Sequence, residues 1–199
     1  MRNTWRILIA TAGFVAITGA NCQLPVGEEP IVFNDSFENG LAAWTQGSDV
    51  PEDPNNPGQP VAWLIEQSDE QADDGQYSAR FYLDGRQDDG TIWLVREFDV
   101  TAGRTYAVTL SFSLWSESES FNTLAKVAAY AGGKAPDVEE DFDVNMAANE
   151  VAGWETYAYV MDATATGNGK IRVAFGISAV WETEMTYYID DVSVEIEPQ

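Results

Sequence analysis

Histidine is absent from this chain of 199 residues, and cysteine occurs once, at Cys22. Without histidine, the chain has no Ser-His-Asp or Cys-His triad, no histidine-ligated zinc and no histidine general base. A single cysteine excludes an internal disulfide. These absences leave binding, or chemistry carried by carboxylate, tyrosine or lysine side chains.

Basic residues are few: 10 Lys and Arg stand against 33 Asp and Glu, which gives a net charge of −23 and an isoelectric point near 4.1. Such a chain repels nucleic acid and anionic membrane surfaces at long range, so we expect no nucleic-acid partner. Two interpretations of the acidity stay open. It can be a solvated surface suited to solubility or a salty medium, or a few of the carboxylates can hold calcium.

The N-terminus has the pattern of a secretory signal peptide, which we place at residues 1–22. Arg2 and Arg6 precede an apolar run, Ile7–Ile17, of 11 residues, and Gly19 and Ala20 follow it. This run is too short to cross a bilayer as a helix, and its flanks are those of a cleaved leader.

Cys22 stands where a bacterial lipoprotein signal has its acylated cysteine. Acylation there would anchor the protein, and a lipid on Cys22 is the only membrane contact that we expect. The alternative is simple secretion after cleavage behind Ala20. Residues 23–30 then form a short tether.

The remainder, 31–199, alternates apolar and polar residues in short runs separated by Gly, Asp and Asn turns, with no long helical pattern. This predicts an all-β fold, an antiparallel β-sandwich or jelly roll of about nine strands in one domain. A short helical turn is expected at Met146–Asn149. The predicted strands are Pro30–Phe37, Val61–Glu66, Tyr77–Leu83, Thr91–Val100, Thr105–Trp115, Asn122–Ala131, Trp154–Asp162, Lys170–Val180 and Thr186–Glu197.

The last of these strands contains an acid among apolar residues. Tyr188, Val192, Val194 and Ile196 share one parity, and Asp190 has the same parity. Alternation therefore predicts a carboxylate on the apolar face of the closing strand, which is costly unless its charge is compensated. A bound cation is the simplest compensation. The alternative is that Asp190 caps a turn or accepts main-chain hydrogen bonds without a metal.

Four stretches together resemble a known family. They are Asn34–Glu38 followed by Trp44, Gly75–Ala79, Phe98–Tyr106 and Tyr188–Val192. In this order they are similar to the jelly-roll carbohydrate-binding modules attached to bacterial cellulases and xylanases, within the galactose-binding-like sandwiches. The likeness covers about Ile31–Ile196.

The resemblance implies that the first and last strands lie together with a structural calcium at the edge of the sandwich. It assigns the side chains of Glu38 and Asp190 as ligands, with main-chain carbonyls near Asp35 and Tyr77. Hard oxygen ligands of mixed carboxylate and carbonyl type suit calcium.

Sugar binding needs aromatic planes for the apolar faces of the rings and polar groups for the hydroxyls. The outward parities of the predicted strands offer Trp115 beside Ser111 and Ser113, Tyr130 beside Lys126, and Arg172 beside Ser178. Trp93 and Trp181 are further candidates. For each aromatic, the alternative is packing beneath a loop. The resemblance transfers no sugar-contacting residue, because these residues vary within the family.

Three functions follow from this reading. The first is a secreted or envelope-anchored, non-catalytic protein that binds a polysaccharide or other glycan. The second is an envelope lipoprotein that uses the same sandwich for protein–protein contact. The third is a polysaccharide-active enzyme, since 33 carboxylates always permit a pair at glycosidase spacing, although no pair stands out in the sequence.

Overall fold

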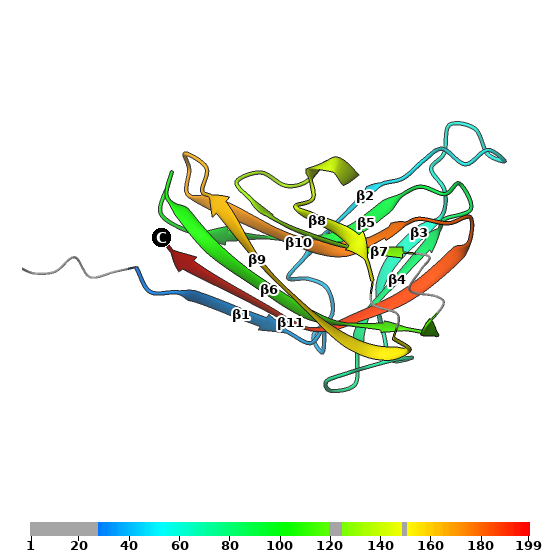
Figure 1. Ribbon diagram of the computed structural model, residues 1–199, viewed down its shortest axis with the longest axis horizontal. Helices are drawn as coiled ribbons and strands as arrows, with labels where there is room; N and C mark the ends of the chain where they lie inside the picture. Colours follow the sequence, from blue (N-terminus) through cyan, green and yellow to red (C-terminus); the bar gives the residue numbers. More distant parts are fainter. Residues whose placement is uncertain (1–27, 120–124, 149–150) are drawn as a thin grey trace, which may run out of the picture.

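Two antiparallel β-sheets pack face to face in the computed structural model, which describes residues 28–119, 125–148 and 151–199 (Figure 1). Residues 1–22, with Cys22, and most of the tether 23–30 lie outside the described residues. The six-stranded sheet contains β1 (Ile31–Asp35), β3 (Trp63–Ser68), β4 (Ser78–Asp84), β6 (Thr105–Ser116), β9 (Gly153–Thr164) and β11 (Glu184–Pro198). The five-stranded sheet contains β2 (Thr45–Asp49), β5 (Thr91–Asp99), β7 (Ala125–Gly132), β8 (Val144–Ala147) and β10 (Lys170–Ala179).

The predicted all-β sandwich is confirmed, with eleven strands in the described residues rather than about nine. The two additional strands, β2 and β8, are short edge strands of the five-stranded sheet. The helical turn expected at Met146–Asn149 was wrong, because Met146 and Ala147 belong to β8 and pair with Val127 and Lys126. A 3₁₀ turn occurs instead at Glu139–Asp141.

Strand β11 organises the six-stranded sheet. Along one side it pairs with β6; along the other, its first half pairs with β4 and its second half with β1. The register between Ile31 and Ile196 places the first strand beside the last. The expectation that these two strands lie together is therefore confirmed.

A β-bulge interrupts β11 between Asp190 and Ser193. Asp190 pairs with Ser113 and Ser193 pairs with Ser111, so three steps along β11 correspond to two along β6. Asp191 adopts the left-handed conformation, with φ of 47°, which aspartate tolerates better than most residues. A bulge of this kind reverses which parity faces the core.

Because of the bulge, the prediction from parity that Asp190 lies on the apolar face was wrong. Val192, Val194 and Ile196 face the core, whereas Tyr188 and Asp190 lie opposite Trp115 and Ser113 on the outer face of the sheet. The inward residues of the first half of β11 are Tyr187 and Ile189, which pair with core residues of β4 and β6. Asp190 is thus not on the apolar face of the sandwich.

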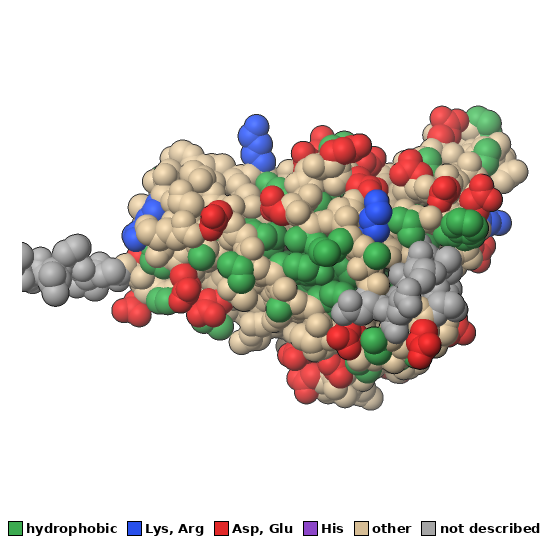
Figure 2. Space-filling model, viewed as in Figure 1, with side chains coloured by type: hydrophobic (Ala, Val, Ile, Leu, Met, Phe, Trp, Pro, Cys, Tyr) green, Lys and Arg blue, Asp and Glu red, His purple; other side chains and the backbone are tan. Residues whose placement is uncertain are grey.

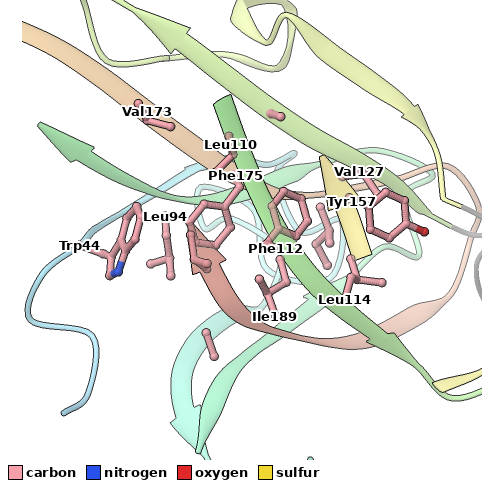
Figure 3. Close-up of a cluster of buried hydrophobic side chains, with 14 of the residues drawn as sticks. Trp44, Leu94, Leu110, Phe112, Leu114, Val127, Tyr157, Val173, Phe175 and Ile189 are labelled. Atoms are coloured by element: carbon pink, nitrogen blue, oxygen red, sulfur yellow. The ribbon is translucent and has the colours of Figure 1, made fainter. Parts of the chain in front are cut away.

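Aromatic rings fill the centre of the core (Figure 3). Phe112 of β6 lies between Phe175 of β10, at 5.4 Å between ring centroids, and Tyr157 of β9, at 6.0 Å. Trp44, just before β2, packs edge-on against Phe175 at 4.9 Å and belongs to the core. The contact of Phe112 with Phe175 joins the two sheets, and its contact with Tyr157 joins the neighbouring strands β6 and β9.

The surface carries the acidity of the sequence. Carboxylates are spread over the face shown in Figure 2, with only a few basic side chains among them. Within the described part of the chain, no helix is long and apolar enough to cross a membrane.

Replacement of Phe175 by alanine tests the assignment of the core. We expect Phe175→Ala to lower the free energy of unfolding by about 3–5 kcal/mol, because it leaves a cavity between the two sheets. The control is Val160→Ala, at a side chain that is 73% exposed, which should change the free energy by no more than about 0.5 kcal/mol. Urea unfolding followed by tryptophan fluorescence measures both. Equal effects would contradict the core described above.

Candidate functional site

A hollow of about 450 Å³ lies on the outer face of the six-stranded sheet, where β4, β11 and β6 run side by side. The strands present their outward side chains to it, because Ala79, Phe81 and Leu83 of β4 and Tyr187 and Ile189 of β11 are taken up by the core. The residues that line it are Glu70, Arg80, Tyr82, Trp115, Glu117, Glu184, Thr186 and Tyr188.

One row of paired residues crosses the sheet through this hollow. Arg80 of β4 pairs with Tyr188 of β11, Tyr188 with Trp115 of β6, and Trp115 with Trp154 of β9. The rings of Trp115 and Tyr188 meet edge to face, with 5.4 Å between centroids and 80° between planes. Trp115 and Trp154 are partly exposed, so aromatic surface on this row remains accessible to a ligand.

Charged groups hold the aromatic row in place at one side. The Arg80 guanidinium contacts Glu66, with Nη1 2.7 Å from Oε1, and Glu70, with Nε 3.8 Å from Oε2. The Tyr188 hydroxyl donates a hydrogen bond to Glu70. Burial, together with the neighbouring Glu70 carboxylate, raises the pKa of Tyr188 to about 12. The hydroxyl therefore stays protonated, and its hydrogen bond to Glu70 holds the ring beside Trp115.

The other side of the hollow is also acidic. Glu184 lies 3.6 Å from Arg86, but Arg86 makes its closer ion pair with Asp84, at 2.5 Å. Burial raises the pKa of Tyr82, and the carboxylates of Glu184 and Asp84 raise it further. Tyr82 thus presents a neutral hydroxyl beside negative groups.

The structure separates the five residues expected to bind sugar. Only Trp115 lies in the hollow. Trp93, Tyr130 and Arg172 are on the outer face of the five-stranded sheet, where β5, β10 and β7 are neighbours. Trp181 is in the connection between β10 and β11 and is 64% exposed.

A loop covers the outer face of the five-stranded sheet. Phe142 packs edge-on against Trp93, at 5.3 Å, and against Tyr130, at 6.2 Å. Trp93 is only 3% exposed as a result, and the Tyr130 hydroxyl donates to the main-chain carbonyl of Lys134. Arg172 binds the carbonyl of Gly133 and the carboxylate of Glu97. These residues hold the loop on the sheet, which was the alternative left open for the aromatics.

Several residues of the hollow were not predicted from the sequence. Arg80 and Tyr82 alternate with the buried Ala79, Phe81 and Leu83, so their outward position could be read from the pattern of Tyr77–Leu83. Tyr188 was assigned inward from the parity of Val192, Val194 and Ile196, but the bulge changes that parity. The signal for its outward position is the alternation of Met185, Tyr187 and Ile189, which are buried before the bulge.

The carboxylates expected to bind calcium hold main-chain N–H groups. The Asp190 carboxylate, fully buried, accepts from Asp73 and Asp74 through Oδ2, at 2.8 and 3.0 Å, and from Asp191 through Oδ1. Glu38 Oε1 accepts from Gln76 and Tyr77, at 2.7 and 2.8 Å. Together the two side chains fasten the loop 69–77 to the end of the sandwich.

The Asp35 carboxylate also accepts hydrogen bonds, from the main-chain N–H of Phe37 at 2.9 Å and from the indole N–H of Trp44 at 2.8 Å. Over residues 28–119, 125–148 and 151–199, no group of three or more acidic, cysteine or histidine side chains is placed to hold a metal. Asp190 Oδ1 and Oδ2 and Glu38 Oε1 accept main-chain N–H groups, as the metal-free alternative for Asp190 expects. Calcium at these residues stays a prediction.

No family model and no curated protein sequence match the chain. The K3 cleaved adhesin domain of Lys-gingipain from Porphyromonas gingivalis is similar in structure, with 17% identity, a TM-score of 0.51, and coverage of 84% of this chain and 99% of that one. The enzymatically active domain of bacteriophage CBA120 tailspike protein 4 has 12% identity and a TM-score of 0.50, over 81% of this chain and 20% of that chain.

Carbohydrate-binding modules are also among the similar structures. One, TmCBM61 in complex with a β-1,4-galactotriose, has 18% identity and a TM-score of 0.46, over 80% of this chain and 92% of that chain. At these identities the comparisons concern the fold alone. The adhesin and tailspike domains, with TM-scores of 0.51 and 0.50, agree with the β-sandwich that the sequence indicated.

The buried Asp190 carboxylate predicts a specific dependence of stability on pH. Burial raises the pKa of Asp190 above its usual value, against the lowering effect of its main-chain hydrogen bonds. Between the usual pKa and the raised one, the unfolded chain is ionised while the folded protein keeps the proton, so folding becomes less favourable as the pH rises. We expect the free energy of unfolding of the wild type, minus that of Asp190→Asn, to fall across this interval.

Urea unfolding of both proteins at several pH values through this interval measures that difference. Carboxylates elsewhere, such as those of Asp84 and Glu97 with lowered pKa values, titrate in both proteins and cancel. A difference that grows with pH would show instead that the ionised carboxylate is the stabilised form.

Chelation tests calcium separately. If the main-chain N–H groups are the partners of Asp190 and Glu38, a chelator leaves the melting temperature unchanged, and added calcium does not raise it beyond the effect of the same concentration of magnesium. If calcium is bound, the chelator lowers the melting temperature, because an ion that binds only the folded state stabilises it. Differential scanning calorimetry distinguishes the two results.

Proposed function

We propose that this protein binds a glycan in the hollow of the six-stranded sheet and does so without catalysing a reaction. The observation that carries the proposal is the row formed by Arg80, Tyr188, Trp115 and Trp154, which combines aromatic surface with charged groups on one side of a sheet. Sugar rings stack their apolar faces on aromatic side chains and direct their hydroxyls to polar groups.

The position of the lining residues on strands supports specific binding rather than non-specific adhesion. The lining residues Arg80, Tyr82, Trp115, Thr186 and Tyr188 come from paired strands, whose backbones are fixed by the sheet. Side chains on such elements keep a precise geometry, and little order has to be gained on binding. Because the hollow is open, it can accommodate an internal segment of a long glycan chain.

We also propose that the protein works outside the cell or on the cell envelope, as the secretory pattern of residues 1–22 suggests. The hollow involves the first half of β11, whereas β1 enters beside its second half, Val192–Ile196. Thr186 and Ile196 are ten residues apart along an extended strand, which corresponds to about 33 Å. If a tether precedes β1, the hollow would therefore lie at the end of the sandwich far from the tether, where it could contact a glycan polymer.

Binding is tested by affinity gel electrophoresis against a panel of soluble polysaccharides, followed by calorimetry with the polymer that retards the protein. We expect Trp115→Ala to reduce the affinity at least about tenfold, because it removes partly exposed aromatic surface from the lining of the hollow. Tyr82→Ala, which removes a smaller aromatic ring from the same lining, should reduce it less. The matched control is Trp181→Ala, which removes an exposed tryptophan outside the hollow.

Unfolding midpoints of all variants show whether the fold is kept. If Trp181→Ala lost binding while Trp115→Ala retained it, the binding site would lie at the loop between β10 and β11 instead of in the hollow. Absence of retardation by every polysaccharide would overturn the proposal, and release of reducing sugars from a retarding polymer would replace it with an enzymatic function.

A further inference from the structure

The hollow carries an excess of negative charge that its basic residues do not offset. Five carboxylates lie in it or at its edge, and two guanidiniums accompany them. The acidic residues are Glu66, Glu70, Asp84, Glu117 and Glu184, and the basic ones are Arg80 and Arg86. The net formal charge of this group is therefore −3.

Both arginines already pair with carboxylates. Arg80 lies between Glu66 and Glu70; burial lowers its pKa, but these carboxylates and Tyr188 raise it by more, so its pKa lies above the usual value. Arg86 lies between Asp84 and Glu184. A carboxylate or sulfate of an incoming polymer would therefore meet guanidiniums whose charge is already offset.

Glu117 and Glu184 remain the least compensated acids of the hollow. Both are exposed, and Glu184 shares its only described basic neighbour, Arg86, with the closer Asp84. Glu117 forms no ion pair with any residue that the structure describes. These two carboxylates line the same hollow as the rings of Trp115, Tyr82 and Tyr188.

Carboxylates beside aromatic rings can together bind an ammonium group. An ammonium is attracted by carboxylates through charge and by the face of an aromatic ring through its quadrupole. Burial raises the pKa of the Tyr82 and Tyr188 hydroxyls, and the carboxylates around them raise it further, in agreement with a negative potential in the hollow. The charge of the whole chain, −23, adds a long-range repulsion toward anionic polymers.

We infer that the hollow prefers glycans with protonated free amino groups, that is, polymers of amino sugars, and discriminates against glycans with carboxylate or sulfate groups. This inference rests on the proposed glycan binding and names the class of glycan. Glu117 and Glu184 contact the amines, while Trp115 supports the sugar ring.

The test uses four oligosaccharides that share one backbone and differ in one substituent: a glucosamine hexasaccharide, an N-acetylglucosamine hexasaccharide, cellohexaose and a glucuronic acid oligomer of the same linkage. Calorimetry in mildly acidic buffer keeps the amines protonated. We expect the glucosamine oligomer to bind roughly tenfold tighter than the acetylated or unsubstituted one at low salt, and the glucuronic acid oligomer not to bind. The advantage should shrink at high salt, where exposed charges are screened.

Charge-removing variants locate the effect. Glu117→Gln and Glu184→Gln should each reduce the advantage of the glucosamine oligomer over the neutral oligomers about threefold. The matched control is Glu197→Gln, which removes an exposed carboxylate from the far end of β11 and should change neither affinity. A preference that all three variants reduce equally would come from the charge of the chain rather than from the hollow, and would overturn the assignment.

The outcomes for the inference and for glycan binding are separate. If a neutral polysaccharide of the wider panel binds through Trp115 while the glucosamine oligomer binds no better than its acetylated form, the inference fails and glycan binding stands. If neither the oligomers nor any polysaccharide of the panel binds, both fail. Binding of the glucuronic acid oligomer with equal affinity also overturns the inference.

Discussion

The extra residue in β11 decides which side of the six-stranded sheet carries apolar and which carries polar groups. A strand has a period of two, so one inserted residue exchanges the two faces beyond it. In β11 the exchange lets Ile189 and Val192 both face the core, although they differ in parity. The same exchange leaves Tyr188 and Asp190 on the outer face. The long strand can therefore pair with β6 on both sides of the bulge, from Tyr188 to Pro198, and still present the candidate site in its first half.

The outward carboxylate at the bulge has a structural consequence for the hollow. Asp190 is removed from water by the loop 69–77, and its oxygens take up N–H groups of that loop. Glu38 holds the other end of the same loop. Because Glu70 belongs to this loop and accepts a hydrogen bond from Tyr188, the anchoring of the loop also positions one wall of the hollow. Stability and the candidate site are coupled here through a few main-chain hydrogen bonds.

The two outer faces of the sandwich differ in accessibility. On the five-stranded sheet, Phe142 lies over Trp93 and Tyr130, and Glu139 holds the same loop through hydrogen bonds with Thr91 and Asn145. On the six-stranded sheet, the aromatic row stays partly open. Similar residue types thus have different roles: on one face the aromatics stabilise a loop, and on the other they are available for stacking.

The sequence by itself determined the fold class and much of the core, because alternation along Thr105–Trp115 assigns five inward and several outward residues with a clear period. It also placed Trp115 on an outer face beside Ser113. Only the tertiary structure decided which outward residues meet. Arg80, Tyr188 and Trp115 come from three strands whose pairing is not local in sequence, and this pairing brings their side chains together. Strand order, register and loop cover depend on how the whole sandwich packs, and these decided that Trp115 lies in an open hollow while Trp93 lies beneath a loop.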